Sequence, residues 1–232
     1  TTPEGEQVNI YGNHVGSWNF AATAYLNQWK VKIYYEHYFD DHSQMFFQYG
    51  RWKDGHIGLE ITFPKNRFID TFVYEGLGTK DQTGPMLYDS FWGEFEEQIS
   101  AKDNYYNHYL YQGWQHWGMG IGNPLLPGPI YNKNGQITFI SNRVLAHHIG
   151  FCGSPCQSLS YRMLLSYSRH WGTYDNPLNE IKKQFNSLFE VTYAPQQLKG
   201  WSFTVSGAMD RGSMLGNNYG GMLVIRKQGI IK

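Results

Sequence analysis

The stretch FNSLFEVTYAPQQLKGWSFTVSGAM, residues 185–209, decides the fold of this chain. Apolar and polar side chains alternate from Phe185 to Tyr193, and the alternation restarts from Trp201 to Met209. A period of two is typical of an extended strand with one apolar and one polar face. The connection between the two runs, 194–200, contains proline and glycine. The stretch therefore predicts an antiparallel hairpin whose two faces differ in chemistry.

Two folds use such strands: a transmembrane barrel with an apolar lipid-facing side, and a soluble β-sandwich with an apolar core side. The same alternation recurs elsewhere in the chain and predicts about nine strands in all. Lys30 and Lys32 share the polar face of one of them. A lysine at the bilayer midplane costs about 2–4 kcal/mol, so this face would be the barrel lumen or solvent. The other predicted strands span 15–26, 57–63, 68–75, 137–151, 158–169 and 219–226.

The connections favour the barrel. Short predicted turns (at Asn27, 64–66, 153–157 and 194–200) alternate with longer connections (40–55, 76–136, 170–183 and 210–218). Short periplasmic turns alternating with long extracellular loops are typical of outer-membrane barrels, whereas Greek-key sandwiches lack this parity. We therefore predict an all-β fold, an antiparallel up-and-down transmembrane β-barrel. Residues 1–232 would form one portion of a larger barrel, with 76–136 as a long aromatic extracellular loop insertion.

Composition agrees with a membrane setting. Aromatic residues make up 17% of the 232 residues and charged residues 16%, whereas a soluble domain carries about 25% charged residues. The formal net charge is zero, which gives no electrostatic reason to bind nucleic acid. No run of about 20 apolar residues exists, which excludes a helical membrane span. The chain starts at Thr1 in a polar run, so we expect a mature or truncated product.

The two cysteines, Cys152 and Cys156, lie in the run FCGSPCQ, which reads as a turn. A local disulfide between them would need an oxidising compartment such as a periplasm. Free thiols and a zinc pair are the alternatives, but no second pair of Cys or His has matching spacing. We predict the disulfide.

Catalytic motifs are missing from the sequence: there is no Gly-x-Ser-x-Gly, no His-Glu-x-x-His and no phosphate loop. We therefore expect no enzyme activity, no cofactor and no metal. The run 36–42 holds metal-ligand residue types, and Glu94, Glu96 and Glu97 could suggest a glycosidase pair, but solvated charged faces explain both better. The charged candidates for the lumen are expected to pair with one another; they are Lys30, Lys32, Glu36, Glu60, Arg162 and Glu190.

The insertion contains the best candidate for a functional site. Aromatic rings stack on the C–H faces of sugars, and amide and imidazole groups bind the hydroxyls. The alternative is that these rings form a small hydrophobic core of the insertion or an interfacial girdle. The candidate carbohydrate-binding residues are Trp92, Tyr105, Tyr106, His108, Trp114 and Trp117.

Several short runs between Tyr105 and Ile225 resemble one family. They are NYYNH (104–108), GW (113–114), GMGIGNP (118–124), NRVLAHH (142–148), LSYRMLLSYS (159–168), LKGWSF (198–203) and GGML (220–223). Together they resemble the Bacteroidetes branch of the capsule-assembly Wzi family, and this chain is similar to the C-terminal half of a member.

The resemblance implies an outer-membrane β-barrel that holds capsular polysaccharide at the bacterial surface as a lectin, not as an enzyme. The expected partners are capsular or surface polysaccharide, outer-membrane lipid, and the remaining barrel half or another outer-membrane subunit, with no nucleic acid. No individual binding residue transfers from the family. Two alternatives are a porin-like or accessory barrel subunit and a soluble carbohydrate-binding or glycoside-processing β-sandwich.

Overall fold

A computed structural model describes residues 16–39, 54–66, 68–82, 103–108 and 113–229. Nine strands form one antiparallel sheet in the order β1-β2-β3-β4-β7-β8-β9-β10-β11, so each strand pairs with its neighbours in the chain. The predicted all-β, antiparallel, up-and-down arrangement is therefore confirmed. The strands are β1 (Gly16–Leu26), β2 (Trp29–Phe39), β3 (Gly55–Thr62), β4 (Thr71–Gly78), β7 (Val144–Cys156), β8 (Leu159–Gly172), β9 (Pro177–Tyr193), β10 (Trp201–Gly212) and β11 (Asn218–Lys227).

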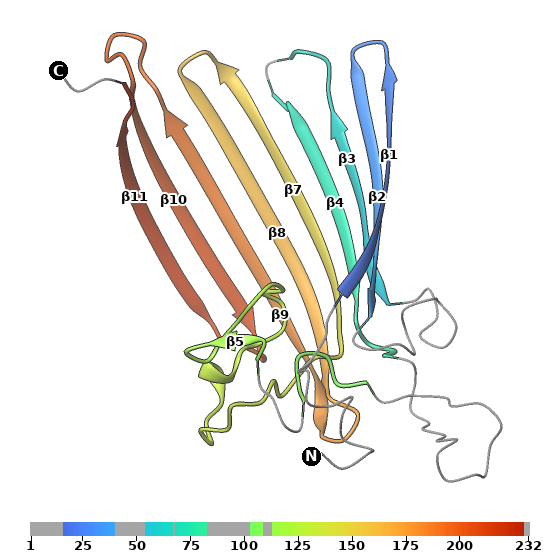
Figure 1. Cartoon of the computed structure of the whole chain (residues 1–232). Coiled ribbons are helices and arrows are strands. Elements are labelled where there is room, and N and C mark those ends of the chain that lie inside the picture. Colours follow the sequence, from blue (N-terminus) through green and yellow to red (C-terminus); the bar gives the residue numbers. More distant parts are fainter. Residues whose placement is uncertain (1–15, 40–53, 67, 83–102, 109–112, 230–232) are drawn as a thin grey trace, which may run out of the picture.

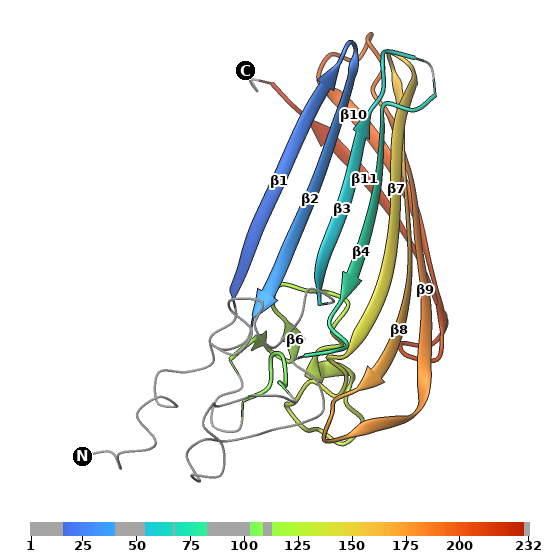
Figure 2. The same ribbon diagram turned by 90° about the vertical axis from the view of Figure 1, so that its right-hand side faces the viewer.

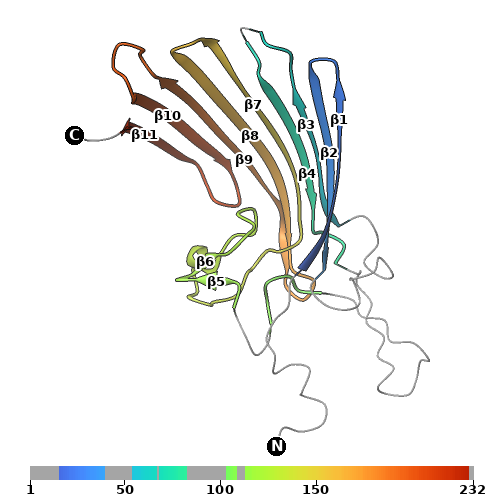
Figure 3. The same ribbon diagram turned by 45° about the horizontal axis from the view of Figure 1, so that its top comes forward.

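The sheet is a curved trough with two unpaired edges. Figure 1 shows β1 and β11 at opposite sides of the sheet. In Figure 2 the sheet curls so that β10 and β11 lie behind β3 and β7, and Figure 3 shows the sheet with its top tilted toward the viewer. Within the described residues β1 pairs only with β2, and β11 only with β10. The described sheet is therefore open.

The two faces of the sheet differ as the alternation predicts. The concave inner face carries Lys30, whose Nζ lies 3.3 Å from Glu60 Oε1, and Thr192, whose hydroxyl bonds that of Thr204 at 2.8 Å. The register places Lys32 and Glu190 on this same face, as predicted for these charged side chains. The convex outer face carries large apolar side chains that are 38–66% exposed, among them Phe20, Ile33, Ile57, Ile149, Phe189, Val205 and Leu223.

The two ends of the sheet also differ. At the turn end, the connections are 27–28, 63–70, 157–158 and 194–200; at the loop end, they are 40–54, 79–143, 173–176 and 213–217. The prediction of a long loop over 170–183 is wrong. Strand β8 continues to Gly172 and β9 begins at Pro177, and these two residues pair with each other. Figure 2 shows this hairpin reaching beyond the neighbouring strands.

The insertion, residues 79–143 in the structure, leaves the sheet after β4 and returns at β7. The predicted bounds were 76–136, and the predicted strand 137–151 begins only at Val144. Its described parts contain a small hairpin of β5 (Gln115–His116) and β6 (Met119–Gly120) and a 3-10 helix, η3 (Pro129–Tyr131). Figure 1 shows these elements at the loop end, in front of the lower part of the sheet.

A small hydrophobic core fixes the insertion to the inner face. Phe139 and Val144 are 1% and 0% exposed, and the rings of Tyr106 and Phe139 meet edge to face at 5.2 Å. Apolar burial of this kind is the main favourable term in packing two segments together. The core consists of Leu77, Tyr106, Leu126, Phe139, Val144 and Ala146.

A buried polar network reinforces this core. The Asn142 amide donates to Asn104 Oδ1 (2.5 Å) and to the carbonyl of Tyr105 (2.9 Å). The Asn142 carbonyl accepts from Thr79 Oγ1 (2.6 Å) and Gln82 Nε2 (3.1 Å). Because buried polar groups cost free energy unless they are paired, these bonds define one position for the insertion.

The Asp54 carboxylate anchors the start of the insertion. It accepts from the backbone N–H groups of Asp81 (2.9 Å) and Gln82 (2.5 Å) and is 2% exposed. Burial raises the pKa of the Asp54 carboxyl to about 6, and these two N–H groups oppose the rise. The charged form is therefore held at a cost in free energy.

The predicted disulfide is absent from the structure, where Cys152 and Cys156 carry free thiols. The segment is not the predicted turn but the end of strand β7, with an irregularity between Gly153 and Cys156. A strand rises about 3.3 Å per residue, so positions four apart exceed the roughly 7 Å that a disulfide can bridge.

Candidate functional site

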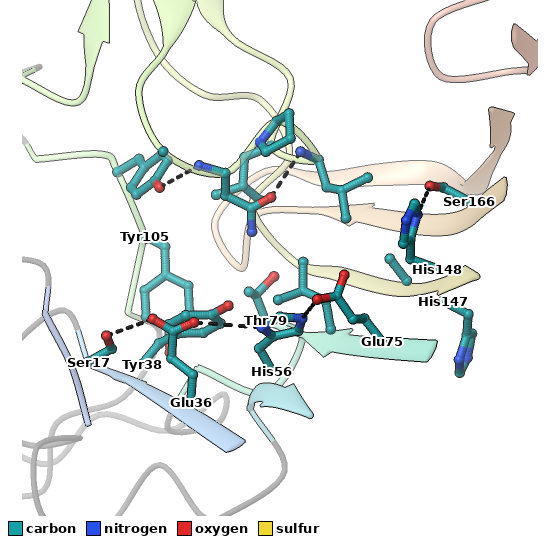
Figure 4. Close-up of a pocket in the computed structure, with 18 of the residues that line it drawn as sticks. Ser17, Glu36, Tyr38, His56, Glu75, Thr79, Tyr105, His147, His148 and Ser166 are labelled. Atoms are coloured by element: carbon teal, nitrogen blue, oxygen red, sulfur yellow. Dashed lines mark hydrogen bonds and ion pairs between the residues drawn. The ribbon is translucent and has the colours of Figure 1, made fainter. Parts of the chain in front are cut away.

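A cavity of about 550 Å³ lies between the insertion and the inner face at the loop end. One wall comes from the strands β1 to β4, β7 and β8, and the other from Tyr105, Tyr106 and residues 122–126 of the insertion. Figure 4 shows these two walls facing each other. Its volume lies within the roughly 300–1,000 Å³ that is usual for small-ligand sites.

A row of polar side chains runs along the strand wall. Glu36 Oε1 accepts from Ser17 Oγ (2.7 Å), and Glu36 Oε2 lies 3.7 Å from Nδ1 of His56. On the other side of the imidazole, Nε2 lies 3.5 Å from Glu75 Oε1. Figure 4 shows the four side chains, from four adjacent strands, in one line. We call Ser17, Glu36, His56 and Glu75 the carboxylate row.

The register of three strands creates this row. Glu36 is opposite His56, and Glu75 is opposite Gly58, two positions further along β3. Tyr34 lies across Gly58, where a Cβ atom would overlap its ring. This space lets the Tyr34 hydroxyl donate to Glu75, while the ring meets His56 edge to face at 5.6 Å. Gly58 is thus required for the packing beside the row.

The adjacent histidines of β7 point to opposite faces, as expected for neighbours on a strand. His148 lines the cavity, and its Nδ1 lies 2.6 Å from Ser166 Oγ. His147 turns away from the carboxylate row in Figure 4 and stacks on Tyr74, with Nδ1 2.8 Å from the phenol oxygen.

The predicted aromatic residues divide into two groups in the structure. Tyr105 and Tyr106 line the cavity and are 4% and 8% exposed. Trp114 stacks on Tyr106 at 5.8 Å and packs against the hydrophobic core of the insertion. For Tyr106 and Trp114 the packing corresponds to the mini-core alternative, although Tyr106 also borders the cavity.

The other predicted carbohydrate-binding residues are not part of the described cavity lining. Trp117 is 83% exposed at the tip of the β5–β6 hairpin and is not among the described residues that line the cavity. His108 is half-buried, and it is also missing from that described lining. Trp92 lies outside the described residues.

Sequence reasoning missed most of the carboxylate row. Glu36 appears among the predicted lumen charges, but His56, Glu75 and Ser17 do not, because their convergence depends on strand register. Two of the expected charge pairs are present, Lys30 with Glu60 and Arg162 with Glu190, each at 3.3 Å. Within the described ranges, no group of three or more His, Cys, Asp or Glu side chains is arranged to hold a metal ion.

Comparisons with known proteins identify no relative: no family model, no curated protein and no solved structure matches the chain. In the part of the chain that the structure describes, no helix is long and apolar enough to cross a membrane.

Proposed function

We propose that this chain forms part of the wall of an outer-membrane β-barrel and binds surface polysaccharide without catalysing a reaction. The observation that carries the proposal is the cavity between the insertion and the inner face, which combines tyrosine rings with hydroxyl, carboxylate and imidazole groups. The resemblance to the capsule-assembly Wzi family agrees with it.

The outer face supports the membrane part of the proposal. Side chains such as Phe20, Val205 and Leu223 are 54%, 61% and 66% exposed, and they recur on successive strands. Contiguous exposed apolar surface of this extent is unusual for a soluble monomer, and lipid would cover it. The inner face, with its ion pairs and hydroxyl groups, suits a wet lumen.

The two edge strands of the sheet support the proposal that another segment completes the barrel. Strands β1 and β11 each present one row of backbone groups with no neighbouring strand among the described residues. In lipid every unpaired backbone group costs several kcal/mol, so both edges need partners. The remaining barrel half, or another outer-membrane subunit, would supply them.

The cavity supports polysaccharide binding. Sugars present apolar C–H faces that stack on tyrosine rings, and hydroxyl groups that donate to carboxylates. Tyr38 and Tyr105 supply the rings, and Glu36 and Glu75 supply fixed acceptors. The loop end that carries this cavity corresponds to the extracellular mouth of an outer-membrane barrel.

Calorimetric titration of the full-length assembled protein in detergent tests the binding. The ligand is capsular polysaccharide purified from the bacterium that produces the protein. We expect saturable binding, and Glu36→Ala should weaken it about tenfold by removing a charged acceptor. Glu190→Ala, which alters an inner-face carboxylate at the turn end, is the matched control and should bind like the wild type.

Two results contradict the proposal. Absence of binding by the wild-type protein would exclude the polysaccharide site. Release of the protein from membranes by carbonate washing would exclude the barrel, because an integral barrel stays in the membrane fraction.

A further inference from the structure

The acidic side chains of the cavity lining come from neighbouring strands. Glu36 and Glu75 contribute two carboxylates, and none of the described lining residues is Lys or Arg. The lining also contains the imidazoles of His56, His147 and His148. The strand wall therefore carries two fixed carboxylates and, among its described residues, no lysine or arginine.

Four cationic side chains of the described sheet and insertion have contacts of their own. Lys30 is paired with Glu60, and Lys32 Nζ lies over the Tyr34 ring at 5.2 Å from its centroid. Arg143 stacks on Tyr174 at 3.8 Å and donates from Nε to the carbonyl of Lys80 (2.9 Å). Arg162 is paired with Glu190 on the inner face. None of these four cations belongs to the described cavity lining.

The two carboxylates are held in place and remain accessible. Ser17 donates to Glu36, and the Tyr34 hydroxyl donates to Glu75, so both side chains are oriented before a ligand arrives. Their side chains are 28% and 30% exposed, and both border the cavity. Preorganised acceptors favour a ligand that brings matching donors.

An ammonium group matches this wall best. It offers three donors and a positive charge, and hydrogen bonds between charged groups are roughly twice as strong as neutral ones. The faces of the tyrosines beside the row attract cations as well. A uronate, sulfate or phosphate group would instead face two carboxylates and be repelled.

From this arrangement we infer that the cavity selects a saccharide unit that carries a protonated amino group, in preference to neutral sugars and against acidic ones. This inference rests on the proposed polysaccharide binding and names the class of sugar for the same site. The selecting groups are Glu36 and Glu75.

Three disaccharides test the selectivity: di-glucosamine, its N,N′-diacetylated form, and digalacturonate. Binding to the full-length protein in detergent is measured by calorimetry at pH 7.0, where most of the primary amines are protonated and an ordinary imidazole is mostly neutral. We expect di-glucosamine to bind about tenfold more tightly than the acetylated form, and digalacturonate to bind most weakly.

The double variant Glu36→Gln/Glu75→Gln keeps the shape of the row and removes its charge. It should lose the roughly tenfold preference for the amine while it still binds the acetylated disaccharide. Glu60→Gln, which removes an inner-face carboxylate outside the cavity lining, is the matched control and should keep the preference.

The outcomes separate the two proposals. Equal binding of the amine and acetyl forms, or a preference that survives in the double variant, overturns the charge selection and leaves sugar binding in place. Tightest binding of digalacturonate also overturns it. Failure of all three disaccharides together with the capsular polysaccharide overturns both proposals.

Discussion

The two ends of the inner face carry the same alternation of side chains but different surroundings. At the loop end the insertion covers the sheet, so Phe139, Gln82 and Asn142 are fully buried. Toward the turn end, charged pairs such as Arg162 and Glu190 lie on an uncovered surface, with side chains 51% and 21% exposed. The alternation of side chains determines which of them point to the inner face. The insertion determines which of these inward side chains are buried. Changes of similar chemistry should therefore differ in effect between the two ends.

The largest effect is expected from Phe139→Ala. Removing a ring that is 1% exposed leaves a cavity in the core that joins the insertion to the sheet, which costs about 3–5 kcal/mol. Hydrogen exchange should show that the insertion opens while the turn-end strands stay protected. Equal loss of protection at both ends would show that the two ends are not independent.

On the outer face of the turn end, Val191→Arg is expected to have the next largest effect. Val191 points to the outer face and its neighbour Thr192 to the inner face, so in the proposed barrel an arginine would face lipid at one position and the lumen at the other. An arginine facing lipid costs up to about 2–4 kcal/mol, the value at the bilayer midplane, and less toward the interface. Membrane-assembled protein, quantified after carbonate washing, should fall for Val191→Arg and change little for Thr192→Arg. Equal losses would exclude a lipid-facing outer side.

At the loop end, Asp54 should make the anchoring of the insertion depend on pH. The pKa of its carboxyl is raised to about 6 by burial, so the folded state binds this proton more tightly than the unfolded chain. The free energy of unfolding should therefore fall as pH rises from about 4 to 6, by roughly 2–3 kcal/mol, and stay level above. Denaturant titrations of the wild type and Asp54→Asn across this range measure the difference. An unchanged pH slope in the variant would contradict the assignment.

The smallest effect is expected from Arg162→Ala at the turn end. Its pair with Glu190 is solvent-exposed, and such pairs contribute about 0–1 kcal/mol. The unfolding midpoint in denaturant should stay near that of the wild type. A loss comparable to that of Phe139→Ala would mean that the turn end has a buried contact that the exposure of Arg162 does not reveal.

Strand prediction from sequence succeeds where one strand face is apolar. The alternation from Trp201 to Met209 lies within β10, and that of 15–26 matches β1 to within a residue. It fails at the start of β9, where Asn179, Glu180 and Lys182 leave no apolar face to detect. There the two strands of a hairpin extend beyond the apolar part of the sheet, and backbone pairing alone defines them.

The candidate site is less predictable than the fold. Tyr105 and Tyr106 are recognisable because an aromatic cluster in a long insertion stands out in the sequence. Within the carboxylate row, Glu36, His56 and Glu75 come from three strands and converge only through the register of those strands. A one-residue slip of β3 would turn His56 to the outer face, so no local pattern identifies it.

The number of strands restricts what can close the sheet. With nine antiparallel strands in the described sheet, β1 and β11 run in the same direction. Two copies of this sheet joined side by side, with their insertions at the same end, would therefore meet through parallel β1–β11 contacts. A segment that pairs antiparallel with both edges must begin and end with strands that run the opposite way, and it must contribute an odd number of strands. The direction of pairing at β1 and β11 therefore distinguishes the two kinds of assembly. Identical copies side by side would pair in parallel, whereas a different segment with an odd number of strands would pair antiparallel at both edges.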